Sequence, residues 1–298
     1  MARSADEVVD QGPGGGVTDQ ADDGEKVADE VGDYVADVGE GHRHQAAEEP
    51  FMTTSNSATR VAIVTGGSRG IGRAVVERLA SDGYHVVVGY RENRTEAEAA
   101  LQVIREADGN AIAIAADVTD ETSVVELFDG AEREFGGVDV VVHAAGVMAL
   151  APLADLDLDQ LDRLLRVNVR GTFAVDQQAA RRVRPGGAII NLSSSLTRFA
   201  RPGYAAYTAS KGAVSAITLI LARELRGRDV TVNAVAPGPT ATALFLEGKD
   251  EQTLAQIAAE APLERLGTPQ DAAELVAFLA GPARWINGQV LFANGGAI

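Results

Sequence analysis

From Arg60 onward, short apolar segments alternate with longer amphipathic ones, and this alternation limits the fold more than any other feature of the sequence. The apolar segments are rich in Val and Ile and are bounded by Gly or Asp. They predict buried strands at Val61–Thr65, Val86–Tyr90, Ala111–Ala115, Val138–His143, Ala188–Leu192, Val230–Val235 and Gln289–Phe292. Helical periodicity lies between them, as at Ile71–Ser81, Glu96–Ala107, Ser123–Phe135 and Ala205–Leu225. The pattern predicts one α/β domain over residues 59–298, a doubly wound parallel sheet with helices on both faces.

The first 58 residues follow a different pattern, with a Gly-Pro-Gly-Gly-Gly run and little sustained apolar periodicity. Residues 1–51 hold 14 acidic and 3 basic side chains and so carry most of the net charge of −17. We predict that residues 1–58 are a disordered acidic extension, because they bury too little to offset their ordering entropy. Two alternatives remain: Met52 is the true start of the protein, or the extension is an acidic tail that binds a partner.

Composition narrows the classes of function. The chain has no cysteine, which excludes disulfides, thiolate metal sites and a cysteine nucleophile, and no metal site is predicted. The absence of a long apolar run and of a signal peptide predicts a cytoplasmic protein outside the membrane. Residues 59–298 are mildly acidic and lack a stripe of Lys and Arg, which argues against nucleic acid as a partner.

A glycine-rich segment, Thr65-Gly66-Gly67-Ser68-Arg69-Gly70-Ile71-Gly72, joins the first strand to the first helix. Glycines let the backbone turn tightly and let its amides approach a pyrophosphate, while the helix N-terminus offers partial positive charge. We therefore predict that this loop binds a nucleotide through Gly66, Ser68, Arg69, Gly70, Ile71 and Gly72. The spacing Thr-Gly-x-x-x-Gly-x-Gly resembles that of the short-chain dehydrogenase/reductase family.

Further along the chain, Tyr207 and Lys211 lie four residues apart in a helical segment and so share one face. A nearby ammonium is expected to lower the pKa of the phenol, which then exchanges a proton with a carbonyl or alcohol oxygen. Three serines follow the fifth predicted strand, and the resemblance selects Ser194, 13 residues before Tyr207, to polarise the substrate oxygen. We predict loop hydrogen bonds for Ser193 and Ser195.

The resemblance extends to two more residues near these groups. In the family an asparagine in the setting of Asn168 completes a proton relay to the lysine, which implies a catalytic set of Asn168, Ser194, Tyr207 and Lys211. Tyr204 has no lysine four residues later, so we predict that it lines the substrate pocket.

The cofactor is predicted to be NADP(H) rather than NAD(H). Tyr90 stands where NAD-specific folds usually carry an acid, and the guanidiniums of Arg91 and Arg69 suit the 2′-phosphate. By resemblance, Asp117 and Val118 contact adenine. The remaining cofactor contacts implied by the family motifs, besides Tyr207 and Lys211, are Ala144, Gly146, Pro237, Gly238, Thr240 and Thr242. His143 departs from the family, which usually has Asn there, and this puts local support of the strand in doubt.

Membership in this family would imply a Rossmann-type sheet of about seven strands in the order 3-2-1-4-5-6-7. It would also imply hydride transfer between a nicotinamide and a small-molecule carbonyl, with a substrate lid from about residue 243 to 262 and a homotetrameric assembly. A 3-oxoacyl thioester or a broad range of carbonyl substrates fits best. The alternatives are a sugar or secondary-alcohol dehydrogenase and a non-catalytic NADP(H)-binding regulator.

Overall fold

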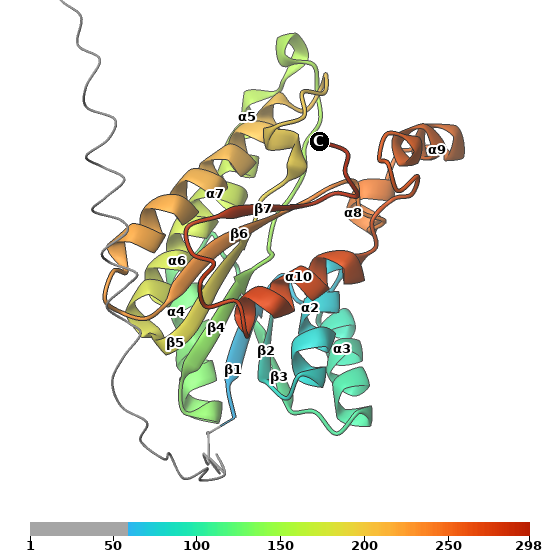
Figure 1. The fold of residues 1–298 in the computed structure, drawn as a ribbon. Coiled ribbons are helices and arrows are strands. Elements are labelled where there is room, and N and C mark those ends of the chain that lie inside the picture. The colour runs from blue at the N-terminus through green and yellow to red at the C-terminus, as the bar shows by residue number, and fades with distance from the viewer. Residues whose placement is uncertain (1–58) are drawn as a thin grey trace, which may run out of the picture. The chain divides into compact units, whose positions relative to one another are not determined.

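Seven parallel strands form a single sheet in the order β3-β2-β1-β4-β5-β6-β7 (Figure 1). This computed structural model describes residues 59–298, so the predictions about residues 1–58 lie outside the described residues. The strands are β1 Val61–Thr65, β2 His85–Tyr90, β3 Ala111–Ala115, β4 Val138–His143, β5 Val183–Leu192, β6 Thr231–Pro237 and β7 Val290–Ala293. The predicted fold class and strand order are confirmed.

The helices are α2 Gly70–Ser81, α3 Arg94–Glu106, α4 Glu121–Phe135, α5 Leu158–Leu165, α6 Gly171–Arg182, α7 Ala205–Glu224, α8 Ala243–Leu246, α9 Glu251–Ala259 and α10 Pro269–Ala280. Helices α2, α3 and α10 cover one face of the sheet, whereas α4, α6 and α7 cover the other (Figure 1). Alternate residues of each strand supply the two hydrophobic cores, as Ala62 and Ile63 do in β1. Because both faces are covered, the strands are continuous apolar runs.

Most predicted elements begin and end within two residues of the observed ones, and β5 is the main correction. The sequence predicts Ala188–Leu192, but β5 begins at Val183 because Val183 pairs with Val138 ahead of a register shift in β4. Gly186 lies inside this irregular part with a φ of +81°, a conformation that favours glycine. Because the run Pro185-Gly186-Gly187 is not typical of a strand, the sequence pattern did not reveal this distorted beginning of β5.

Among the described helices, α7 has the length and mean hydropathy of a membrane-crossing segment, with a mean hydropathy of 1.3 over 18 residues. It packs against β5 and β6 here, and 33% of that window is buried. Core helices of globular domains share this composition. The position of α7 on the sheet matters for function because it carries Tyr207 and Lys211.

Candidate active site

A cavity of about 430 Å³ opens along the carboxyl ends of the strands, within the usual size range of ligand pockets. In an open parallel sheet this edge holds the ligand crevice, at the point where the strand order reverses. Here the reversal lies between β1 and β4. Except for Asn168, all predicted site residues line this cavity.

The glycine loop after β1 leaves no room for a side chain at Gly66 or Gly72. A Cβ on Gly66, whose φ is +66°, would lie 2.8 Å from the backbone of Ala145, and one on Gly72 would lie 2.2 Å from the Gly66 carbonyl oxygen. The side chain of Arg69 does not cap α2, so the first-turn amides of that helix remain free to bind an anion. The loop therefore fits the pyrophosphate of a dinucleotide.

Ser194, Tyr207 and Lys211 meet at the other end of the cavity. Ser194 is the second residue after β5, and its Oγ accepts a hydrogen bond from the Leu196 amide at 3.3 Å. The Lys211 ammonium donates to the Leu192 carbonyl oxygen at 2.7 Å and lies 5.9 Å from the centre of the Tyr207 ring. One helix and one strand end thus hold the three groups together.

The expected effect of Lys211 on Tyr207 is wrong for this structure. Burial raises the pKa of Tyr207 to about 12, and contact with the Ser194 side chain opposes this only in part. Burial also lowers the pKa of Lys211 to about 8. Removal from water disfavours the charged form of both groups, and this outweighs their mutual influence. Tyr207 is therefore a neutral phenol at neutral pH, which suits a proton donor.

Asn168 lies behind the cavity in a π-helix, Arg166–Arg170, between α5 and α6. Such widened turns occur often at functional sites, and this one explains an asparagine inside a helical segment. Its side chain accepts a hydrogen bond from the Val147 amide at 2.9 Å and donates to Ser210 Oγ at 3.0 Å. A Cβ on Gly146 would lie 3.4 Å from Asn168 Oδ1 and 3.5 Å from Lys211 Nζ, so both polar groups converge on Gly146.

His143 makes one hydrogen bond at the end of β4, where the sequence raised a doubt, while its buried Nε2 has no hydrogen-bond partner. Its Nδ1 lies 2.8 Å from Thr65 Oγ1, and this bond ties β4 to β1 inside the sheet. Burial, with a smaller contribution from Lys211, lowers the pKa of His143 to about 3, so the ring is neutral. Histidine thus replaces the expected asparagine as a structural hydrogen-bonding group.

The part of the cavity predicted to hold adenosine is lined by Arg69, Tyr90, Arg91, Asp117 and Val118. Glu92 also lines it and pairs with Arg91 at 2.9 Å, a contact that sequence reasoning missed. Both side chains are more than half exposed, so this pair is weak and exchangeable. Asp117 Oδ1 accepts from the Thr119 amide at 2.9 Å, which fixes its carboxylate at the cavity wall.

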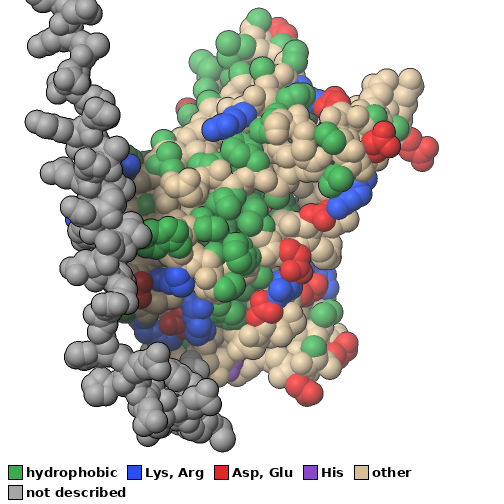
Figure 2. Space-filling view, in the orientation of Figure 1, with side chains coloured by type: hydrophobic (Ala, Val, Ile, Leu, Met, Phe, Trp, Pro, Cys, Tyr) green, Lys and Arg blue, Asp and Glu red, His purple; other side chains and the backbone are tan. Residues whose placement is uncertain are grey.

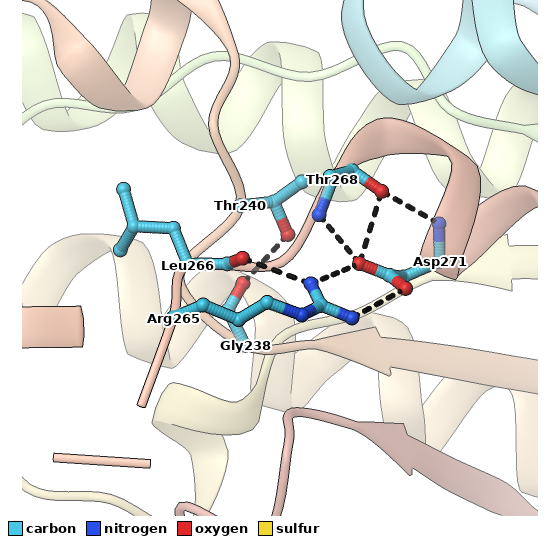
Figure 3. A network of polar contacts seen from close by, with 6 residues as sticks. All are labelled: Gly238, Thr240, Arg265, Leu266, Thr268 and Asp271. Carbon is cyan, nitrogen blue, oxygen red and sulfur yellow. Dashed lines mark hydrogen bonds and ion pairs between the residues drawn. The ribbon is translucent and has the colours of Figure 1, made fainter. Parts of the chain in front are cut away.

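The loop after β6, which is predicted to contact the nicotinamide, is fastened at its base (Figure 3). Thr240 Oγ1 donates to the Gly238 carbonyl oxygen at 2.9 Å, and Thr240 pairs with Gly267 in an isolated bridge. Beyond that bridge, Asp271 accepts from Arg265 and from the Thr268 amide at the start of α10. The two ends of the segment 241–266, which contains α8 and α9, are thereby held side by side.

Several neighbours of the site went unpredicted. Ser193 and Ser195 make the expected loop hydrogen bonds, to the Lys211 and Ala236 carbonyl oxygens, but they also line the cavity. Arg201, Glu260 and Ile298 line it as well, and no motif marks them. Their positions at the cavity depend on how the loops fold over the sheet, which no local sequence pattern reveals. Within residues 59–298, no cluster of three or more His, Asp or Glu side chains could hold a metal.

Comparison with known proteins places these features among oxidoreductases. The family model described as enoyl-(acyl carrier protein) reductase matches residues 66–297. A short-chain type dehydrogenase/reductase of Picea abies is 46% identical over 250 residues, covering 80% of this chain and 92% of the relative. A chloroplastic NADPH-dependent aldehyde reductase-like protein of Arabidopsis thaliana is 41% identical, covering 86% and 99%. A Burkholderia cenocepacia short-chain dehydrogenase solved with NADP superposes with a TM-score of 0.75 at 41% identity, covering 80% and 98%.

Proposed function

The chain belongs to the short-chain dehydrogenase/reductase family, and on that premise we propose that it uses NADPH to reduce a ketone or aldehyde carbonyl to an alcohol. One observation carries the proposal: a single cavity joins the glycine loop to Ser194, Tyr207 and Lys211. The substrate is a 3-oxoacyl thioester or another carbonyl compound. Apolar residues at the substrate end support this class, among them Met148, Leu196, Phe199, Leu244 and Phe245.

The preference for NADPH over NADH follows from the adenosine end. Tyr90 provides no carboxylate to repel a 2′-phosphate, and Arg69 and Arg91 line the same wall. A bound phosphate would compete with Glu92 for Arg91, and the exposed Arg91–Glu92 pair costs little to break. The Arabidopsis relative is named for its NADPH dependence, which agrees with this assignment.

The cofactor, when bound, supplies a hydride to the carbonyl carbon. The Ser194 hydroxyl donates a hydrogen bond to the carbonyl oxygen and stabilises the charge that develops there. The Tyr207 hydroxyl transfers its proton to that oxygen, completing the alcohol, and Lys211 stabilises the phenolate that remains. Asn168 keeps its place between Val147 and Ser210, so that it supports the segment packed beside the Lys211 ammonium.

Loss of one hydroxyl tests this assignment. Replacing Tyr207→Phe removes the proton donor and keeps the ring, so we expect kcat to fall about 10²–10⁴-fold. The measurement is NADPH oxidation with acetoacetyl-N-acetylcysteamine and with 4-methylbenzaldehyde, run in parallel with NADH. Tyr204→Phe is the matched control, because Tyr204 also lines the cavity and has no lysine four residues later.

The outcomes separate the candidate functions. Turnover that survives in Tyr207→Phe contradicts the mechanism, and comparable efficiency with NADH contradicts the cofactor preference. Oxidation of sugars or secondary alcohols by NADP⁺, with no carbonyl reduction, would identify a dehydrogenase instead. NADPH binding without turnover of any of these compounds would favour a regulator.

A further inference from the structure

Two charged side chains, Arg201 and Glu260, line the substrate end of the cavity. They come from different segments: Arg201 lies in the loop that follows Ser194, and Glu260 directly follows α9. The side chains around them are apolar or aromatic, including Leu196, Phe199 and Phe245. A charge on the part of a substrate that reaches this pair would therefore interact with it directly.

The two members of the pair differ in exposure, and the Glu260 side chain is 40% exposed. Arg201 Nη2 lies 2.5 Å from Glu260 Oε1 and also contacts the second carboxylate oxygen. The Arg201 side chain is only 22% exposed, and its guanidinium stacks 5.4 Å from the centre of the Phe199 ring. A shielded arginine is a strong binder of carboxylates, and here Glu260 occupies that capacity.

A second cation lies near the pair but is directed elsewhere. Lys249 donates to the Phe245 carbonyl oxygen at 2.5 Å and lies 4.6 Å from the centre of that ring. Its pKa is lowered by burial and by the nearby charge of Arg201. Lys249 does not line the cavity, so Arg201 is the cation that lines this end besides Lys211 of the catalytic group.

The segment that follows Glu260 is fastened at several points. After Glu260, Gly295 and Gly296 of the C-terminal segment pack on Ala261 and Pro262, and a Cβ on Gly296 would lie 3.1 Å from Pro262. Further on, the Thr240–Gly267 bridge and the Arg265–Asp271 contact fasten the end of the segment to the sheet and to α10 (Figure 3). The backbone after Glu260 is therefore ordered, which lowers the entropic cost of keeping Glu260 near Arg201.

We propose that Glu260 is a specificity-determining residue: it occupies Arg201 and thereby excludes carbonyl compounds that carry a carboxylate on the part of the molecule that reaches this pair. Such a substrate would have to displace Glu260 from Arg201 and then face its negative charge. Uncharged apolar carbonyl compounds meet no such barrier and are the preferred substrate class. The assignment rests on the proposed carbonyl reduction, which it refines.

Two aldehydes of similar shape test the proposal. For wild type and Glu260→Gln, kcat/KM is measured with 4-methylbenzaldehyde and with 4-carboxybenzaldehyde, using NADPH. Glu260→Gln frees Arg201, so the preference for the carboxylate-bearing aldehyde should rise at least about tenfold. The double variant Arg201→Gln/Glu260→Gln should lose this gain. Glu247→Gln changes an exposed acid of the same segment and should leave the preference unchanged.

A binding measurement separates this proposal from the proposed function. Calorimetric titration of the protein with NADP⁺ present, using benzoate and benzamide, should show a gain in benzoate affinity for Glu260→Gln alone. That gain without turnover of either aldehyde would leave the role of Glu260 standing and overturn the proposed reaction. An unchanged aldehyde preference and an unchanged benzoate affinity, in Glu260→Gln and Glu260→Ala alike, would overturn the proposal.

Discussion

Lys211 shows how burial alone shifts the pKa of a single residue, and with it the pH range in which the side chain is charged. Its side chain is removed from water by α7 and β5, and its pKa is lowered to about 8 although no cation pairs with it directly. Tyr207 responds in the opposite direction, with a pKa raised to about 12. A carbonyl reductase benefits from this pair, because the phenol stays protonated while the lysine can still be charged.

The pH profile should report the titration of Lys211. Below about pH 8 the lysine is a cation that stabilises the developing Tyr207 phenolate, and above that pH it loses its charge. We therefore expect kcat/KM for carbonyl reduction to fall about tenfold per pH unit above this value. Stopped-flow NADPH oxidation across the alkaline range, with circular dichroism to verify folding, measures it. A flat profile through this range would show that reduction does not need the charged lysine.

At the scale of elements, the glycine loop shows most clearly why the sequence predicts the site well. Gly66 and Gly72 are required because backbone atoms of Ala145 and of the loop itself occupy the space of a side chain. That constraint is local, so it leaves a readable motif. The central strands were equally predictable, because the continuous apolar runs of β1, β2, β4, β5 and β6 follow directly from burial on both faces.

Other features could not be read from the sequence because they depend on contacts between distant segments. Glu260 and Arg201 are 59 positions apart, and neither belongs to a motif. The pKa of Tyr207 depends on how completely the folded chain excludes water, which spacing along a helix does not reveal. The early start of β5 depends on its pairing with Val138. Sequence patterns thus predicted the cavity residues near the glycine loop better than those near Arg201 and Glu260.

The close packing of the glycine loop leads to a prediction that separates steric fit from helix propensity. In Gly72→Ala the new methyl group would lie 2.2 Å from the Gly66 carbonyl oxygen, so we expect the loop to be displaced and NADPH affinity to fall at least tenfold, equivalent to about 1.4 kcal/mol.

Gly212→Ala is the control. Gly212 lies in α7 with no atom within 4 Å of its Cβ position, and this change should stabilise the fold by about 0.5–1 kcal/mol. Fluorescence titration with NADPH and urea denaturation measure the two effects. Equal NADPH affinity for both variants would contradict the steric account.

At the scale of the whole molecule, exposed apolar side chains suggest what the family resemblance also implies, a homotetramer. Phe173 on α6 and Ile220 on α7 are each 57% exposed on the face away from the sheet. A second apolar area surrounds β7 and the segment before it, where Trp285 is fully exposed and hydrophobic side chains gather (Figure 2). Where large exposed apolar side chains form a contiguous patch, the patch marks a surface that binds other proteins.

Two separate apolar areas allow assembly about two different axes, which is what a tetramer with dihedral symmetry needs. We expect Phe173→Glu/Ile220→Glu to disrupt one of the two contacts and yield dimers, because an unpaired charge buried in an interface is costly. Sedimentation velocity at micromolar concentration measures the mass of wild type and variant. Leu153→Glu, which changes a side chain that is 73% exposed outside both areas, should leave the tetramer intact. A wild-type protein that sediments as a monomer would refute the assembly, and Phe173 and Ile220 would then need another partner.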